Sequence, residues 1–284
     1  MKTPRFLSPK TALIAVGGYA ALCGLVYLRQ QTILYRPAKP NRQTPVARTV
    51  IEENHRGPEL RGWVDNPGQK LGLVYFGGAS EPIELRRESL AKAFPHHTRY
   101  MVPYRGFGPN CHLRPDEGNI KEDALRLVRH VKSQHEGMHI IGRSLGTGMA
   151  LHVAARIPVM AVGLITPYDS ILEVAKGNYR WLPVTRLLRD RFESWRDASR
   201  VHVPILTCLA EIDKVVPPKR TEALLRHLPS EPSCCTITGS NHRTIAQCDD
   251  LWQRLSGFFA KDVELILGGP KAEASAKPRR RPGR

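Results

Sequence analysis

The chain has 284 residues, long enough for one substantial α/β core with short extensions, and it carries a formal net charge of +17. The basic excess is concentrated at the ends, because no acidic residue precedes Glu52 and the tail Lys271–Arg284 has six basic residues and one acidic residue. We therefore assign the charge to a membrane flank and a solvated tail, and we expect no nucleic-acid partner. The six cysteines show no C-x-x-C spacing and no grouping with histidine, so we expect neither a disulfide scaffold nor a metal site, and no cofactor.

An uncharged, mostly apolar run covers the 18 residues Thr11–Leu28 near the N-terminus, with basic residues on both sides. As a helix it would be about 27 Å long, close to the hydrocarbon thickness of a bilayer, about 30 Å. We predict an uncleaved single-pass transmembrane anchor. A cleaved signal peptide is the alternative, although a convincing small-x-small site before the domain is missing. The basic residues on the two flanks nearly balance, so the positive-inside rule favours neither side of the membrane for the domain.

Five segments make up the predicted organisation of the chain. A basic flank (1–10) precedes the anchor (11–28), and a linker with three prolines and several basic residues (29–45) follows it. The α/β domain covers 46–262, and a disordered basic tail (263–284) ends the chain.

Strand and helix patterns alternate along the domain. The predicted strands are Val46–Ile51, Leu60–Val64, Leu71–Phe76, Thr98–Pro103, Gly137–Ile141, Val159–Thr166, Val203–Ala210 and Cys234–Ile237. The predicted helices are Pro82–Phe94, one capped by Asn119 and running to Ser133, Met149–Arg156, short helices within Pro167–His202, Pro218–Leu228 and Ala246–Phe259. This alternation predicts an α/β fold with a mostly parallel central sheet and helices on both faces.

A G-x-S-x-G pattern, Gly142-Arg143-Ser144-Leu145-Gly146, stands between a buried strand and a helix rich in small residues. A strand-to-helix turn this sharp strains the backbone of the serine, and the flanking glycines avoid side-chain collisions. The turn would expose the Ser144 hydroxyl at the carboxyl edge of the sheet, so we predict Ser144 as a nucleophile. An ordinary tight turn is the alternative interpretation.

Two further polar residues follow strands at the same edge of the predicted sheet. Asp213 closes the strand Val203–Ala210, and His242 lies in a loop after the last strand. His242 would take the proton of Ser144, and Asp213 would hold the imidazole tautomer and stabilise the imidazolium. Asp169, which also follows a strand end, is a rival for the acid. A loop histidine without a catalytic role is the alternative for His242.

Backbone N–H groups near Ser144 are candidates for an oxyanion hole. The first donor is the N–H of Leu145, directly after the nucleophile. The second comes from the loop Gly77-Gly78-Ala79 at the end of the strand Leu71–Phe76, with the Ala79 N–H as the candidate. A glycine turn needed only for its backbone conformation is the alternative.

The combination of these motifs resembles the α/β-hydrolase superfamily, which shares the chain order Ser, Asp, His. Within it, the chain resembles the group with a single N-terminal membrane anchor and little or no cap domain, which includes protein depalmitoylase-like members. The similarity covers about Leu34 to Phe259. It rests on the serine motif with Thr147-Gly148, the Asp213 and His242 loops, Leu34-Tyr35-Arg36-Pro37, Tyr104-Arg105-Gly106-Phe107-Gly108 and Thr166-Pro167-Tyr168-Asp169-Ser170. One difference is the oxyanion loop, where the group usually has His-Gly-Asn and this chain has Gly77-Gly78-Ala79.

The resemblance implies a membrane-tethered serine hydrolase that cleaves carboxylic esters or thioesters, small or lipid-like, through an acyl-enzyme intermediate. A serine peptidase of prolyl-oligopeptidase-like type and a non-catalytic anchored interaction protein are the alternatives. The apolar residues of Pro167–His202 would either pack the domain or line an acyl channel that opens toward the bilayer; they are Tyr168, Tyr179, Trp181, Leu182, Leu187 and Leu188.

Overall fold

The computed structural model describes residues 8–36, 46–54 and 57–268. Within these residues an eight-stranded sheet has the order β1-β2-β4-β3-β5-β6-β7-β8. Its strands are β1 Arg48–Ile51, β2 Leu60–Asp65, β3 Leu71–Phe76, β4 His97–Met101, β5 Gly137–Arg143, β6 Ala161–Ile165, β7 Ile205–Ile212 and β8 Ser233–Asn241. Strands β3 to β8 run parallel, and β2 pairs antiparallel with both β1 and β4. The predicted α/β fold with a mostly parallel sheet is therefore confirmed.

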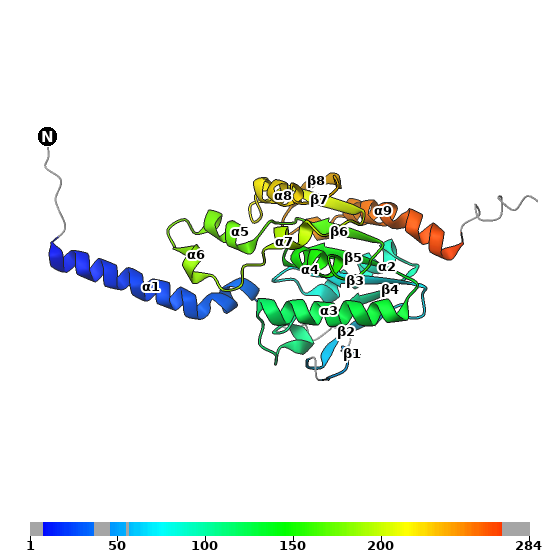
Figure 1. Ribbon diagram of the computed structural model, residues 1–284, viewed down its shortest axis with the longest axis horizontal. Helices are drawn as coiled ribbons and strands as arrows, with labels where there is room; N and C mark the ends of the chain where they lie inside the picture. The colour runs from blue at the N-terminus through cyan, green and yellow to red at the C-terminus, as the bar shows by residue number, and fades with distance from the viewer. Residues whose placement is uncertain (1–7, 37–45, 55–56, 269–284) are drawn as a thin grey trace, which may run out of the picture.

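Helices cover both faces of the sheet (Figure 1). They are α1 Pro9–Tyr35, α2 Arg87–Ala93, α3 Glu117–Gln134, α4 Leu145–Ala154, α5 Ile171–Asn178, α6 Val184–Leu187, α7 Ser194–Ala198, α8 Pro218–Leu225 and α9 Asp249–Leu267, with short 3-10 helices at Ile83–Arg86, Gly108–Asn110 and Ile245–Gln247. Alternate residues of β3 point to opposite faces: Val74 and Phe76 pack with α3 and α4, whereas Leu73 and Tyr75 pack with α2 and α9.

Several predicted boundaries need correction. The N-cap of α3 is Asp116, whose carboxylate accepts the N–H of Asn119 at 2.9 Å, so the prediction of Asn119 as the cap is wrong. Helix α4 begins at Leu145 rather than at Met149, because the serine turn leads directly into the helix. Helix α9 continues to Leu267, five residues past the predicted domain end at 262, because its apolar residues keep helical spacing beyond that point.

The N-terminal apolar run forms α1, which is longer than the predicted anchor. It covers Pro9–Tyr35, so the prediction of a linker from residue 29 is wrong for residues 29–35, which are helical. The helix is long and apolar enough to cross a membrane, judged by length and composition. Residues 1–7 of the predicted basic flank, 37–45 of the predicted linker and 269–284 of the predicted tail lie outside the described residues.

The C-terminal end of α1 is packed into the domain. Tyr35 is fully buried, and its ring makes edge contacts with Phe107 and Phe192 at centroid distances of 6.5 and 6.3 Å. Its hydroxyl donates to Asp190 Oδ2 at 2.8 Å. The other oxygen of Asp190 accepts the Glu117 N–H at the start of α3, at 3.3 Å. Helix α1 and the α/β domain are therefore joined through a shared core.

Candidate active site

The turn between β5 and α4 holds Ser144 in a strained conformation. Its φ and ψ are 49° and −117°, a region that non-glycine residues rarely adopt. A side chain at Gly142 would collide with the carbonyl group of Gly146, and one at Gly146 would collide with the carbonyl oxygen of Phe76. The predicted strain and the need for both glycines are confirmed. The serine consequently stands at the carboxyl end of β5, immediately before the first turn of α4.

The structure brings the three residues predicted from the sequence into one hydrogen-bonded row. Ser144 Oγ lies 2.9 Å from His242 Nε2, and His242 Nδ1 lies 2.8 Å from Asp213 Oδ2. With Nδ1–H donating to the carboxylate, Nε2 is the acceptor for the Ser144 hydroxyl. The side chains of His242 and Asp213 are 11% and 7% exposed, so water competes little for these bonds.

Strand ends position the acid and the base. Asp213 follows β7 and His242 follows β8, the two strands that pair in parallel at one side of the sheet. Asp213 Oδ1 also accepts the N–H groups of Val215 at 2.9 Å and Val216 at 2.8 Å. Burial raises the pKa of Asp213, but the His242 hydrogen bond and the two backbone donors outweigh it and hold this pKa below its usual value. The carboxylate is therefore ionised at neutral pH.

Asp169, the rival acid, is occupied elsewhere. Its Oδ2 lies 3.0 Å from Arg220 Nη1, and its Oδ1 accepts the N–H of Ser170 at 2.8 Å. Burial raises the pKa of Asp169 despite the Arg220 cation. These contacts place Asp169 in an ion pair with α8 rather than at His242.

One predicted oxyanion donor directly follows the serine, and the loop that carries the other faces it. The Leu145 N–H belongs to the first turn of α4, where backbone donors have no intrahelical acceptor. In the loop after β3, the Gly78 N–H is already bonded to Glu81 Oε2 at 2.9 Å. The following residue, Ala79, is half-buried and packs against the core. A carbon at the Cβ position of Gly78 would sit 3.5 Å from Ser144 Cβ, so this loop directly faces the serine.

A buried ion pair that sequence reasoning missed connects the loops of the site. Arg143 Nη1 lies 3.0 Å from Glu81 Oε2, and Arg143 Nη2 donates to the carbonyl oxygen of His242 at 2.7 Å. Glu81 in turn holds the Gly78 N–H and accepts the hydroxyl of Tyr75. Arg143 therefore bridges the glycine loop and the histidine loop on either side of Ser144. Arg143 occupies a variable position of the G-x-S-x-G pattern, so the motif carries no signal for this role.

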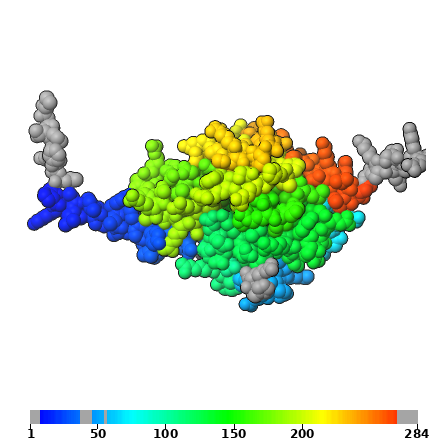
Figure 2. All heavy atoms as spheres, in the orientation of Figure 1, coloured from blue at the N-terminus to red at the C-terminus, as the bar shows by residue number. Residues whose placement is uncertain are grey.

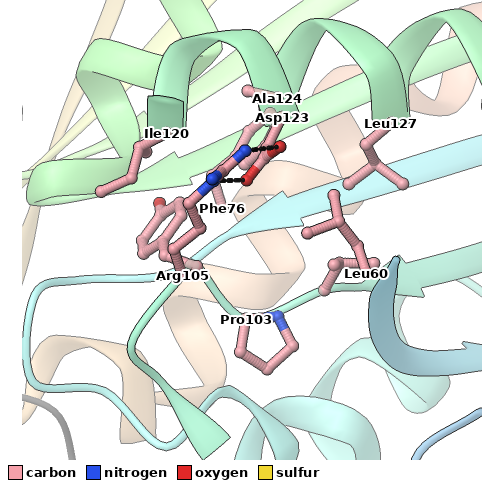
Figure 3. Close-up of a pocket in the computed structure, with 10 residues that line it drawn as sticks. Leu60, Phe76, Pro103, Arg105, Ile120, Asp123, Ala124 and Leu127 are labelled. Carbon is pink, nitrogen blue, oxygen red and sulfur yellow. Dashed lines mark hydrogen bonds and ion pairs between the residues drawn. The ribbon is translucent and has the colours of Figure 1, made fainter. Parts of the chain in front are cut away.

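The hollow in Figure 3 lies between the ends of β3 and β4 and helix α3, beside the Arg105–Asp123 ion pair. Its lining residues include Leu60, Phe76 and Leu127. The centre of a water molecule can move within about 20 Å³ of this hollow, so it has room for about one water. It is too small for an acyl chain. A second hollow, lined by Gly77, Gly78, Glu81, Ile83, Val102, Pro103, Tyr104 and Phe107, adjoins the glycine loop.

The residues considered for an acyl channel do not share one environment. Tyr168 is fully buried, and its hydroxyl lies 3.3 Å from the carbonyl oxygen of Leu145, so it packs the domain. Tyr179 and Trp181 are 38% and 57% exposed and lie on the segment between α5 and α6.

Within the described part of the chain, no group of three or more His, Cys, Asp or Glu side chains could hold a metal ion.

Comparison with known sequences gives relatives at moderate identity. No protein-family model matches the chain. An uncharacterized protein of Mycobacterium tuberculosis is 27% identical over 249 residues, which cover 82% of this chain and 87% of that protein. The lysophosphatidylserine lipase ABHD12 of Danio rerio is 32% identical over 134 residues, which cover 40% of this chain and 35% of the lipase.

Comparison with solved structures gives the fold. The esterase Pf2001 of Pyrococcus furiosus superposes with a TM-score of 0.61 at 15% identity, over 79% of this chain and 98% of that one. The esterase Est1E of Butyrivibrio proteoclasticus superposes with a TM-score of 0.58 at 16% identity, over 72% and 96%. The chain has the α/β-hydrolase fold, as its sequence predicts.

Proposed function

We propose that this chain, an α/β-hydrolase by fold, is a membrane-tethered serine hydrolase of carboxylic esters or thioesters. The observation that carries the proposal is the hydrogen-bonded row of Ser144, His242 and Asp213 behind a strained serine turn. A structural serine has no need of a strained backbone with positive φ or of a buried imidazole–carboxylate pair, both of which cost stability.

The proposed reaction divides ester cleavage into two steps. His242 Nε2 takes the proton of Ser144 as Oγ attacks the carbonyl carbon, and the Leu145 and Ala79 N–H groups stabilise the oxyanion. The imidazolium, stabilised by Asp213, then protonates the leaving alcohol or thiol, which departs and leaves the acyl-enzyme. In the second step His242 takes a proton from water, the resulting hydroxide attacks the acyl carbon, and Ser144 departs with the proton.

Two observations support the class of substrate and the tether. Relatives and fold neighbours include esterases and a lipase, which favours ester bonds and lipid-like substrates. Helix α1 has the length and composition of a membrane span. Hydrolysis of a lipid ester would release an alcohol and a fatty acid.

A fluorophosphonate probe tests the nucleophile, because it reacts with serines activated by a neighbouring base. The wild-type chain should be labelled at Ser144 and should hydrolyse p-nitrophenyl esters. Ser144→Ala should lose labelling and about 10⁴- to 10⁶-fold in kcat while keeping its circular dichroism spectrum. Labelling of Ser144→Ala at the wild-type rate would refute the assignment.

A further inference from the structure

Helix α1 contacts the domain along more than half of its length. Beyond Tyr35, Gln30 Oε1 accepts the N–H of Arg189 at 2.8 Å. Further toward the N-terminus, the Tyr19 hydroxyl donates to the carbonyl oxygen of Trp181 at 2.8 Å. The contacts therefore extend over 16 residues, about 24 Å of helix. Figure 2 shows the same arrangement: the surface of α5 and α6 lies against α1, and the N-terminal end of α1 projects free.

The part of α1 that is free of the domain is too short to cross a bilayer. From Pro9 to Tyr19 the helix rises about 15 Å, about half of a hydrocarbon core of about 30 Å. A membrane that surrounds the apolar run Thr11–Leu28 must therefore also surround Tyr19 and the Trp181 backbone bonded to it.

The level of the membrane surface follows from the other end of the apolar run. The Arg189 guanidinium lies over the Tyr27 ring, with its Cζ 4.1 Å from the ring centroid, and Arg29 comes two residues after Tyr27 in α1. Tyrosine and arginine side chains at the end of an apolar helix favour the headgroup region. Measured along α1, Tyr19 and hence Trp181 lie eight residues deeper, about 12 Å. This depth is still within the leaflet nearest to the domain.

The residues of the segment suit this position. The tip, defined here as Tyr179–Pro183 between α5 and α6, exposes the rings of Tyr179 and Trp181. Aromatic rings have a large apolar area, which favours lipid over water. The Trp181 carbonyl group has its donor in Tyr19, which removes the cost of an unpaired backbone group in lipid. Arg180 is exposed, and its long side chain can extend toward the headgroups.

We propose that the tip Tyr179–Pro183 inserts with α1 into the leaflet nearest to the domain, so that its partner is the lipid of that leaflet. The inference rests on the membrane insertion of α1 proposed above, but not on the hydrolase activity. Two insertions, joined by the Tyr19 and Gln30 contacts, fix the orientation of the domain on the membrane surface. A tether through a flexible linker alone would leave that orientation free.

Quenching of tryptophan fluorescence by brominated phosphatidylcholine tests the position of the tip. The full-length chain is placed in phosphatidylcholine vesicles with and without bromine on the acyl chains. The chain has four tryptophans, and Trp63 and Trp252 are buried in the domain. Trp181→Phe should remove most of the quenchable emission, whereas the matched variant Trp195→Phe, on α7, should leave it unchanged. Both substitutions change exposed or half-buried rings, so neither threatens the fold.

A second variant separates the two proposals. Leu13→Trp, made in a chain that also carries Trp181→Phe, reports on α1 alone, because Leu13 is exposed on the free part of the helix. Bromolipid quenching of Leu13→Trp together with quenching of Trp181 supports the inserted tip. Quenching of Leu13→Trp without quenching of Trp181 overturns the tip insertion and keeps the tether. Absence of quenching at both positions overturns the tether and the inserted tip together.

Discussion

The substitution Arg143→Met is expected to affect both stability and catalysis, because it removes a cation from the centre of the site. The Glu81 side chain is only 5% exposed, and its remaining cation would be Arg86, whose Nε lies 3.6 Å from Glu81 Oε1. Breaking a buried pair costs about 3–5 kcal/mol, and the remaining arginine favours the lower end, about 3 kcal/mol. Loss of the hydrogen bond to the His242 carbonyl group adds about 1 kcal/mol. The sum, about 4 kcal/mol, is a large part of the usual 5–15 kcal/mol for a domain.

The catalytic effect follows from the same contacts. Without Arg143, the glycine loop and the His242 loop lose their common partner, and a displacement of about 1 Å can cost about 10²-fold in rate. We therefore expect kcat/KM to fall about 10²-fold at a temperature where the variant is folded. Urea unfolding in detergent, followed by fluorescence, measures the free energy of unfolding. The rate of fluorophosphonate labelling measures the reactivity of Ser144.

A matched variant separates positioning from loss of stability. Arg105→Met breaks another buried ion pair, with Asp123, and neither residue contacts Ser144 or His242 within the described residues. It should lower the urea midpoint while the folded protein keeps its labelling rate. Equal loss of labelling in both variants would refute the positioning role of Arg143. So would an Arg143→Met enzyme with wild-type kinetics.

Two further predictions concern acidic residues. Asp213→Asn should lower kcat about 10⁴-fold by favouring the wrong histidine tautomer, whereas Asp169→Asn should change kcat far less; the reverse ranking in an ester assay would assign the acid to Asp169. Burial raises the pKa of Asp197, but hydrogen bonds from His152 and Arg156 lower it to about 2. Since the folded pKa lies below the unfolded value of about 3.9, this stabilisation, about 2–3 kcal/mol, is present above pH 4 and should be lost as the pH falls toward 2. Asp197→Asn should remove that component from urea unfolding measured across this range, and an unchanged pH profile would contradict it.

The sequence by itself determined the features that depend on local pattern. The glycines around Ser144 specify the strained turn, and alternating strand and helix patterns specify a parallel sheet. Because the carboxyl ends of parallel strands meet at one edge, the positions of Asp213 and His242 after their strands were enough to predict their meeting with the serine. Their catalytic roles remain predictions.

Only the tertiary structure decided the contacts between residues far apart in sequence. Arg143 forms an ion pair with Glu81, 62 residues away in sequence, and Asp169 pairs with Arg220 rather than with His242. Tyr35, placed in a linker by its sequence, is instead a core residue that joins α1 to the domain. The sequence around a charged or aromatic residue does not identify its partner, because the energy of the contact depends on burial and geometry that arise only when the chain folds.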